Sequence, residues 1–185
     1  MNGTISLNKK AIFAKAIIAV VGIAAGVALP QIFHAIGLLT STGAAVGSAL
    51  LPMHIPVLFA GFVGGAVAGM VVGVLSPVVS FLISGMPAAA ILPFMIIELG
   101  VYGLAAGLLS KSKLNSFVKL IIVQLAGRTA RIAAVLISIY AMGNTQLGIA
   151  AVYTFILDGL FGIVLQWVVV PLALPYLQKI KRLYE

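Results

Sequence analysis

Long apolar runs, broken by short polar or Gly/Pro-rich stretches, follow one another along the whole chain. An α-helix needs roughly 20 apolar residues to cross a bilayer core about 30 Å thick, and most runs are near that length. Backbone exposed to lipid must be hydrogen-bonded internally, so the pattern predicts an all-α membrane protein. The predicted helices cover residues 11–37, 53–64, 65–84, 90–110, 116–142 and 148–176.

The uncharged segment 53–84 is the ambiguous part of this pattern. A single helix of that length would measure about 48 Å, so the segment is either one strongly tilted span or two short ones. Lys and Arg residues decide between the two, because they gather in cytoplasmic loops. Two crossings, with a turn near Gly64–Gly65, place every basic group on one side of the membrane. We therefore predict six transmembrane helices with both termini in the cytoplasm.

The composition indicates that lipid surrounds this chain. Of its 185 residues, 63% are hydrophobic and 8% are charged, which is too little polar surface for a water-soluble globule. The net charge of +8 comes mainly from groups beside the apolar runs, which is typical of a topology signal and not of a nucleic-acid partner. These groups are Lys9, Lys10 and Lys15; Lys111, Lys113 and Lys119; and Lys179, Lys181 and Arg182. We expect a single transmembrane domain over residues 1–185, as a multi-pass protein of a bacterial cell membrane.

Four formal charges lie inside the predicted helices: Glu98, Arg128, Arg131 and Asp158. A central Arg, Lys or Asp costs roughly 2.5–3.5 kcal/mol on insertion scales, so these side chains must face one another or water. Counted from the predicted outer helix ends, Glu98, Asp158 and Arg131 lie at similar depths. Two interpretations stay open. The charges form internal ion pairs that hold the helices together, or they line a substrate pocket that is entered from outside.

Further polar residues share helix faces with these charges. Gln124, Arg128 and Arg131 lie on one face through i+4 and i+3 spacing, and Glu98 stacks with Tyr102 in the same way. Pro52 and Pro56, on either side of His54, set a helix start at the outer side. The candidate substrate-binding residues are His54, Glu98, Tyr102, Gln124, Arg128, Arg131 and Asp158.

Small residues recur four positions apart in the first predicted helix, as Gly22 with Gly26 and Ala24 with Ala28. This spacing lets helix backbones approach closely in lipid. It indicates packing within the bundle or docking of a helix from a partner. We keep all four residues as candidates for partner docking.

The chain lacks the motifs of membrane enzymes. It has no cysteine and two histidines, and no phosphate-binding G-x-x-x-x-G-K-[ST] loop, H-E-x-x-H helix or G-x-S-x-G elbow occurs. We expect no catalysis, metal or cofactor of its own, so any ATP-driven step requires partner subunits. The alternatives are a stand-alone proton-coupled transporter with Glu98 or Asp158 as carrier, and a non-transporting subunit of a membrane assembly.

A run of motifs over residues 50–110 resembles one family, the substrate-binding S components of energy-coupling factor (ECF) transporters. The run comprises Leu51-Pro52-Met53-His54-Ile55-Pro56-Val57-Leu58, Gly61, Gly64-Gly65, Gly69, Gly73, Ser76-Pro77, Ser80, Gly85-Met86-Pro87, Glu98-Leu99 and Tyr102-Gly103. The resemblance implies capture of a vitamin or vitamin precursor outside the cell. It also implies delivery through a transmembrane coupling subunit with two ATPase subunits, which use ATP and Mg²⁺. Pyridoxine or hydroxymethylpyrimidine-like rings and pantothenate are the candidate substrates.

The same resemblance implies roles for the first helix and for the loop after it. The family often has an A-x-x-x-A docking motif early in that helix, whereas here Ala11 is followed four residues on by Lys15. Ala24 with Ala28, or Gly22 with Gly26, would then take its place. The loop at 38–52 is expected to close the pocket.

Overall fold

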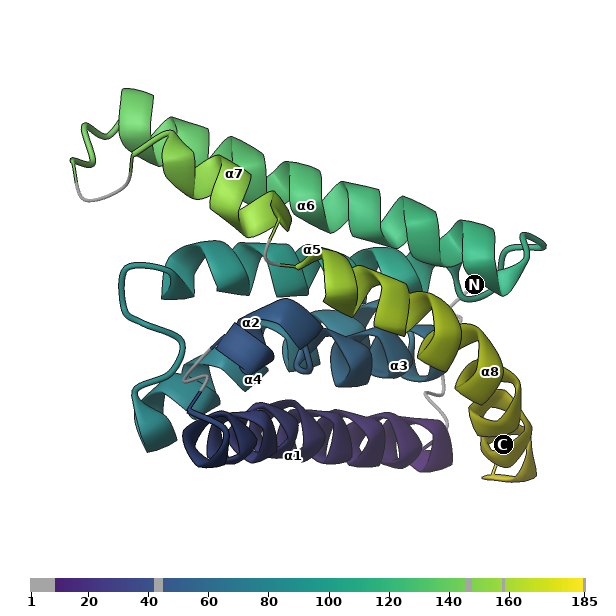
Figure 1. Cartoon of the computed structure of the whole chain (residues 1–185). Coiled ribbons are helices and arrows are strands. Elements are labelled where there is room, and N and C mark those ends of the chain that lie inside the picture. The colour runs from purple at the N-terminus through teal and green to yellow at the C-terminus, as the bar shows by residue number, and fades with distance from the viewer. Residues whose placement is uncertain (1–8, 42–44, 146–147, 158, 185) are drawn as a thin grey trace.

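The computed structural model describes residues 9–41, 45–145, 148–157 and 159–184. Throughout these residues the regular elements are α-helices, in agreement with the predicted class (Figure 1). They are α1 (Lys9–Leu39), α2 (Ala45–Leu50), α3 (His54–Gly64), α4 (Ala66–Ser84), α5 (Leu92–Leu109), α6 (Ser116–Tyr140), α7 (Ala150–Leu157) and α8 (Leu160–Tyr184).

Five stretches in the described part of the chain are long and apolar enough to cross a membrane. They are Ala11–Leu39, Ala66–Ser84, Leu92–Leu109, Ser116–Tyr140 and Val152–Lys179. His54–Gly64 is a shorter apolar helix. At 11 residues it is about 16 Å long, or roughly half of the bilayer core.

The segment 53–84 forms two helices that turn at Gly65, where the sequence predicts the break. Gly65 has a φ of +89°, a conformation that side chains disfavour. A Cβ atom at Gly69 would contact the Cα atom of Gly61, so α3 and α4 lie against each other as an antiparallel hairpin. The split that the basic residues favoured is therefore present in the fold.

Glycines also set the spacing between α4 and α5. A Cβ atom on Gly69 or Gly73 would overlap backbone atoms of Gly103 or Leu99, and Gly103 meets the backbone of Gly69 in the same way. These contacts make α4 and α5 antiparallel at close approach, which is the use of small residues expected in lipid. Near the other end of α5, Gly107 lies against Ala66.

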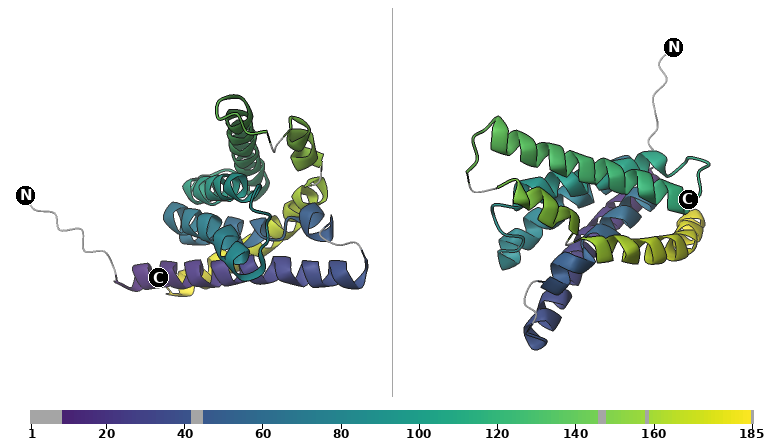
Figure 2. Two further views of the ribbon diagram at one scale, coloured as in Figure 1. Left: turned by 90° about the vertical axis from the view of Figure 1, so that its left-hand side faces the viewer. Right: turned by 45° about the horizontal axis from the view of Figure 1, so that its top comes forward.

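The helix ends place the basic groups together. The start of α1, the connection from α5 to α6 and the end of α8 all lie at one end of the bundle (Figure 1). These segments carry Lys15, Lys111, Lys113, Lys119 and Lys179. The connection from α4 to α5 lies at the opposite end, and Figure 2 shows α1 along one side of the bundle, inclined to the other helices.

Two features of the helix pattern differ from the sequence-based prediction. The predicted loop at 38–52 contains the short helix α2. The predicted helix 148–176 is divided into α7, which ends at Leu157, and α8, which begins at Leu160 and continues to Tyr184. Pro171 and Pro175 lie within α8, where the apolar pattern continues past them.

Candidate ligand-binding site

A cavity of about 340 Å³ opens at the end of the bundle away from the basic groups. Its wall combines residues from α1, α2, α3, α4, α5, α6 and α7 with the connections between them. Most of that wall is apolar, with Pro30, Leu51, Pro52, Met53, Met86, Pro87, Ala88, Ile91, Met95 and Phe155. The charged and imidazole-bearing side chains in it are His34, His54, Arg128 and Arg131.

Glu98 is the centre of a buried polar cluster at the inner end of this cavity. Its side chain is fully buried, and its Oε2 accepts a hydrogen bond of 2.5 Å from Nη1 of Arg131. Its Oε1 lies 3.3 Å from Nε of Arg128 and 3.5 Å from Nε2 of His54. Three predicted site residues, from α3 and α6, thus converge on one carboxylate of α5, which lies behind the cavity wall.

Tyr102 lies behind this cluster. Its ring packs edge-on against the ring of His54, with centroids 4.9 Å apart and planes at 82°. Gly127 of α6 makes room for the tyrosine, because a Cβ atom there would overlap the ring. Tyr102 is fully buried and supports His54 from the side away from the cavity.

Phe155 and Gly159 position the two arginines, and the sequence analysis missed both. Nη1 of Arg128 donates to the carbonyl oxygen of Phe155 at 2.7 Å, and the guanidinium carbon of Arg131 lies 3.9 Å from the centroid of the Phe155 ring. A Cβ atom on Gly159 would overlap Nη2 of Arg128. No helix-face spacing in the sequence pointed to either residue, because Phe155 belongs to α7 whereas Gly159 precedes the start of α8.

Gln124 lies outside the cavity wall, although it shares a helix with the arginines. Its Oε1 accepts from Nε1 of Trp167 at 2.7 Å, and its Nε2 donates to Oε1 of Gln166 at 3.0 Å. The ring of Phe117 packs against Trp167 with centroids 5.3 Å apart. These groups join α6 to α8.

Asp158, the remaining predicted site residue, lies outside the described residues. Among the residues that are described, no group of three or more His, Cys, Asp or Glu side chains is placed to hold a metal ion.

Comparison with family models gives a match over residues 14–174 to the family described as ECF transporter, substrate-specific component. This chain belongs to that family. This match confirms the family that the sequence motifs resemble. The chain is therefore a transport subunit and a multi-pass protein of the cell membrane. Searches of curated proteins and of solved structures give no match.

The four docking candidates of this substrate-specific component face two different ways. Gly22 and Gly26 are buried, with Val72 and Ser76 of α4 directly against them. Ala24 and Ala28 are exposed. They line an apolar groove of about 400 Å³ together with Val20, Ile23, Val27, Val79 and Ile83.

Proposed function

We propose that this substrate-specific component binds a small water-soluble vitamin or vitamin precursor in the cavity and passes it to a transmembrane coupling subunit. Two ATPase subunits on that partner would hydrolyse ATP with Mg²⁺, while this chain binds no cofactor. The family match supports the role in transport. The observation that carries the proposal for the site is the buried cluster of Glu98, Arg128 and Arg131, which opens onto the cavity.

The interior position of these charges argues for a ligand-binding role. Ionisable side chains within membrane spans usually mark a substrate path because burying them in lipid is costly. Besides the contacts of the two arginines with Glu98, Arg128 Nη2 and Arg131 Nε are buried without an acceptor in the described structure. A cavity of about 340 Å³ suits a small ligand, since sites for small molecules occupy roughly 300–1,000 Å³.

The charge distribution supports an orientation with the cavity open to the outside. Basic residues are concentrated in cytoplasmic loops, so the end with Lys15, Lys111, Lys113 and Lys179 would face the cytoplasm. The cavity opens at the other end, beside the connection from α4 to α5. Both chain termini would then be cytoplasmic, with six crossings if α3 and its preceding segment count as one.

The groove at Ala24 and Ala28 is the surface that we propose for docking of the coupling subunit. Exposed alanines four residues apart allow a partner's helix to approach closely, and the groove contains no charge among its lining residues. Gly22 and Gly26 are already covered by α4, so they serve the bundle itself.

Purification from membranes that contain candidate coupling and ATPase subunits tests this function. We expect the chain to co-purify with them, and to bring a small molecule that mass spectrometry of the denatured sample identifies. Uptake of labelled pyridoxine or pantothenate should require ATP and the partner subunits. Uptake by this chain alone that an uncoupler abolishes would contradict the proposal and support a proton-coupled transporter.

A further inference from the structure

We infer that the ligand of this cavity carries a carboxylate, which binds at Arg128 and Arg131, and an uncharged body that packs against Met53, Met86 and Met95. The inference rests on the proposed function, because it narrows the class of molecule that the same cavity takes. It distinguishes a carboxylate such as pantothenate from an uncharged or cationic ring compound.

The first argument is the balance of charge at the cavity wall. Arg128 and Arg131 line the cavity with side chains 13% and 9% exposed, whereas Glu98 is fully buried behind them. Both Glu98 oxygens already face guanidinium nitrogens. Within the described residues, one carboxylate therefore serves two guanidinium groups and leaves one positive charge toward the cavity. A buried charge without a counterion is costly, so an anionic ligand stabilises the site.

The second argument is the presence of unused hydrogen-bond donors on the two arginines. Nη2 of Arg128 and Nε of Arg131 are buried donors without an acceptor in the described structure. Leaving such a donor unpaired costs about 1–3 kcal/mol, and more when the group is charged. Arginine has donors only, so a ligand group that pairs with these atoms must be an acceptor. Carboxylate oxygens are the acceptors that match guanidinium best.

The guanidinium of Arg128 is held ready for this contact. Its Nη1 donates to the carbonyl oxygen of Phe155, and its Nη2 lies against Gly159, which also lines the cavity. Preorganised donors lose little conformational entropy when a ligand binds. The N-terminal end of α3 at His54 lies at the same wall and adds the partial positive charge of a helix N-terminus.

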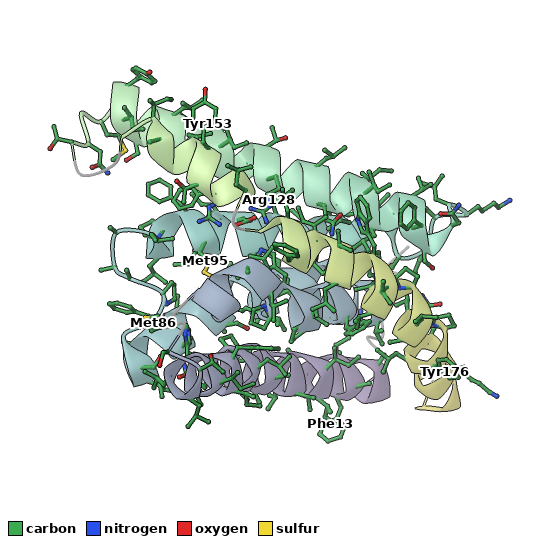
Figure 3. The ribbon with its side chains drawn as sticks, in the orientation of Figure 1. Phe13, Met86, Met95, Arg128, Tyr153 and Tyr176 are labelled. Atoms are coloured by element: carbon green, nitrogen blue, oxygen red, sulfur yellow. The ribbon has the colours of Figure 1, made fainter. Side chains whose placement is uncertain are left out.

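The remainder of the wall specifies the rest of the molecule. Figure 3 shows Arg128 in the interior, with Met95 and then Met86 closer to the end where the cavity opens. Methionine side chains adapt to apolar and aromatic surfaces. Among the described residues the surplus is one positive charge, which matches a monoanion, whereas a phosphate ester would bring nearly two charges into a mostly apolar cavity. The ligand is thus a compact monocarboxylate.

Matched ligand pairs test this inference on the full-length protein in detergent. Pantothenate with panthenol and nicotinate with nicotinamide replace a carboxylate by an uncharged group, and calorimetry measures the affinity of each. For a pair that binds, we expect the carboxylate to bind about 10–100-fold tighter than its neutral counterpart. Arg128→Gln should remove that preference and leave the affinity for the neutral compound within about threefold.

Two further variants separate charge recognition from folding. Arg128→Lys keeps the positive charge, so it should retain part of the preference that Arg128→Gln loses. Gln166→Leu alters a buried polar side chain outside the cavity and should keep the full preference. If every variant lost affinity equally for the carboxylate and for its neutral counterpart, Arg128 would have a structural role. That result would overturn the inference.

The ligand that purifies with the protein provides an independent test of the inference. We expect its mass to increase by one CH2 unit after methyl esterification, because one methyl group replaces the acid hydrogen of one carboxyl group. A retained ligand without an acidic group, or tighter binding of the neutral members of the pairs, overturns the inference and leaves the transport function standing. Absence of any ligand, of binding to either pair and of association with a coupling subunit would overturn the proposed function itself.

Discussion

Glu98 shows how a single buried residue organises the site. Its two oxygens face Arg131, Arg128 and His54, which come from α6 and α3, so it links three helices at one point. Removing one partner of a buried charged cluster leaves the others unpaired, which typically costs 3–5 kcal/mol. The carboxylate therefore both holds the helices together and aims the guanidinium groups.

Glu98→Ala is expected to reduce ligand affinity by more than tenfold, because Arg131 and Arg128 lose the acceptor that orients them. Calorimetry with the natural ligand measures the loss, and size-exclusion chromatography checks that the protein remains folded. Ile97→Ala is the matched control, since Ile97 precedes Glu98 on α5 and is 41% exposed. Unchanged affinity in both Glu98→Ala and Arg128→Ala would leave the cluster as an ion-pair network without a role in binding.

Gly159→Ala is expected to weaken ligand binding while the protein still folds. Its new methyl group would displace the guanidinium of Arg128, which is the flexible end of a long side chain and can move. Gly148→Ala is the control, because no atom of the described residues lies within 4 Å of a Cβ atom there. We expect affinity to fall about tenfold in the first variant only, and equal affinities would show that the position of Arg128 is not critical.

At the scale of elements, helix packing relies on glycines for which the bundle has no substitute. The contacts of Gly69 and Gly73 with α5 are backbone to backbone, so a side chain there cannot be accommodated by rotamer changes. By contrast, the contact between α6 and α8 relies on the polar side chains of Gln124, Gln166 and Trp167. The first interface therefore depends on close backbone contact, and the second on hydrogen bonds between side chains.

Gly103→Ala should destabilise the protein, because the methyl group would overlap the backbone of Gly69. Overpacking costs about 1–3 kcal/mol, which for a chain of this size corresponds to a decrease in Tm of roughly 2–12 °C. Thermal unfolding in detergent measures it. Gly100→Ala meets only a side-chain methyl of Val74 at 3.3 Å and should change the Tm much less.

Gln124→Leu should lower thermal stability but change ligand affinity by less than about threefold. The substitution leaves the indole N–H of Trp167 and the buried amide of Gln166 without their partner, outside the cavity wall. The same two measurements on Arg128→Ala should show the larger effect on affinity. A large loss of affinity in Gln124→Leu would restore Gln124 to the binding site, where its helix face first suggested it.

At the scale of the whole molecule, the cavity and the groove that we propose for docking have different lining residues. The cavity opens at one end of the bundle, whereas the apolar groove runs along α1 and α4 on the side. Phe13, on α1, and Tyr176, on α8, project from the surface near the basic end in Figure 3, where aromatic side chains are favoured at a membrane interface. A partner can therefore approach through the membrane without covering the cavity.

Ala24→Leu is expected to abolish co-purification with the coupling subunit and to leave ligand affinity unchanged, because the leucine fills the groove away from the cavity. Ala133→Leu adds the same bulk at an exposed position on α6 and should not affect assembly. Pull-down and calorimetry on the same preparations compare the two. Normal assembly of the Ala24 variant would place docking on another surface.

The sequence by itself determined the all-α membrane class, the turn near Gly65, the grouping of the basic residues and the presence of Glu98, Arg128 and Arg131 within the helices. These features follow from hydrophobic length, glycine conformation and the cost of charge in lipid, which are local properties of the chain. The family also follows from motifs along the sequence.

Only the tertiary structure decided which faces meet. Ala24 lies two residues after Gly22 and thus roughly 200° around the helix, so one faces outward and the other inward. Gln124 shares its helix with Arg128 but turns to α8, and Phe155 enters the site through its backbone carbonyl. Spacing along a helix determines which residues share a face, but the rotation of each helix about its axis is set by close packing with its neighbours.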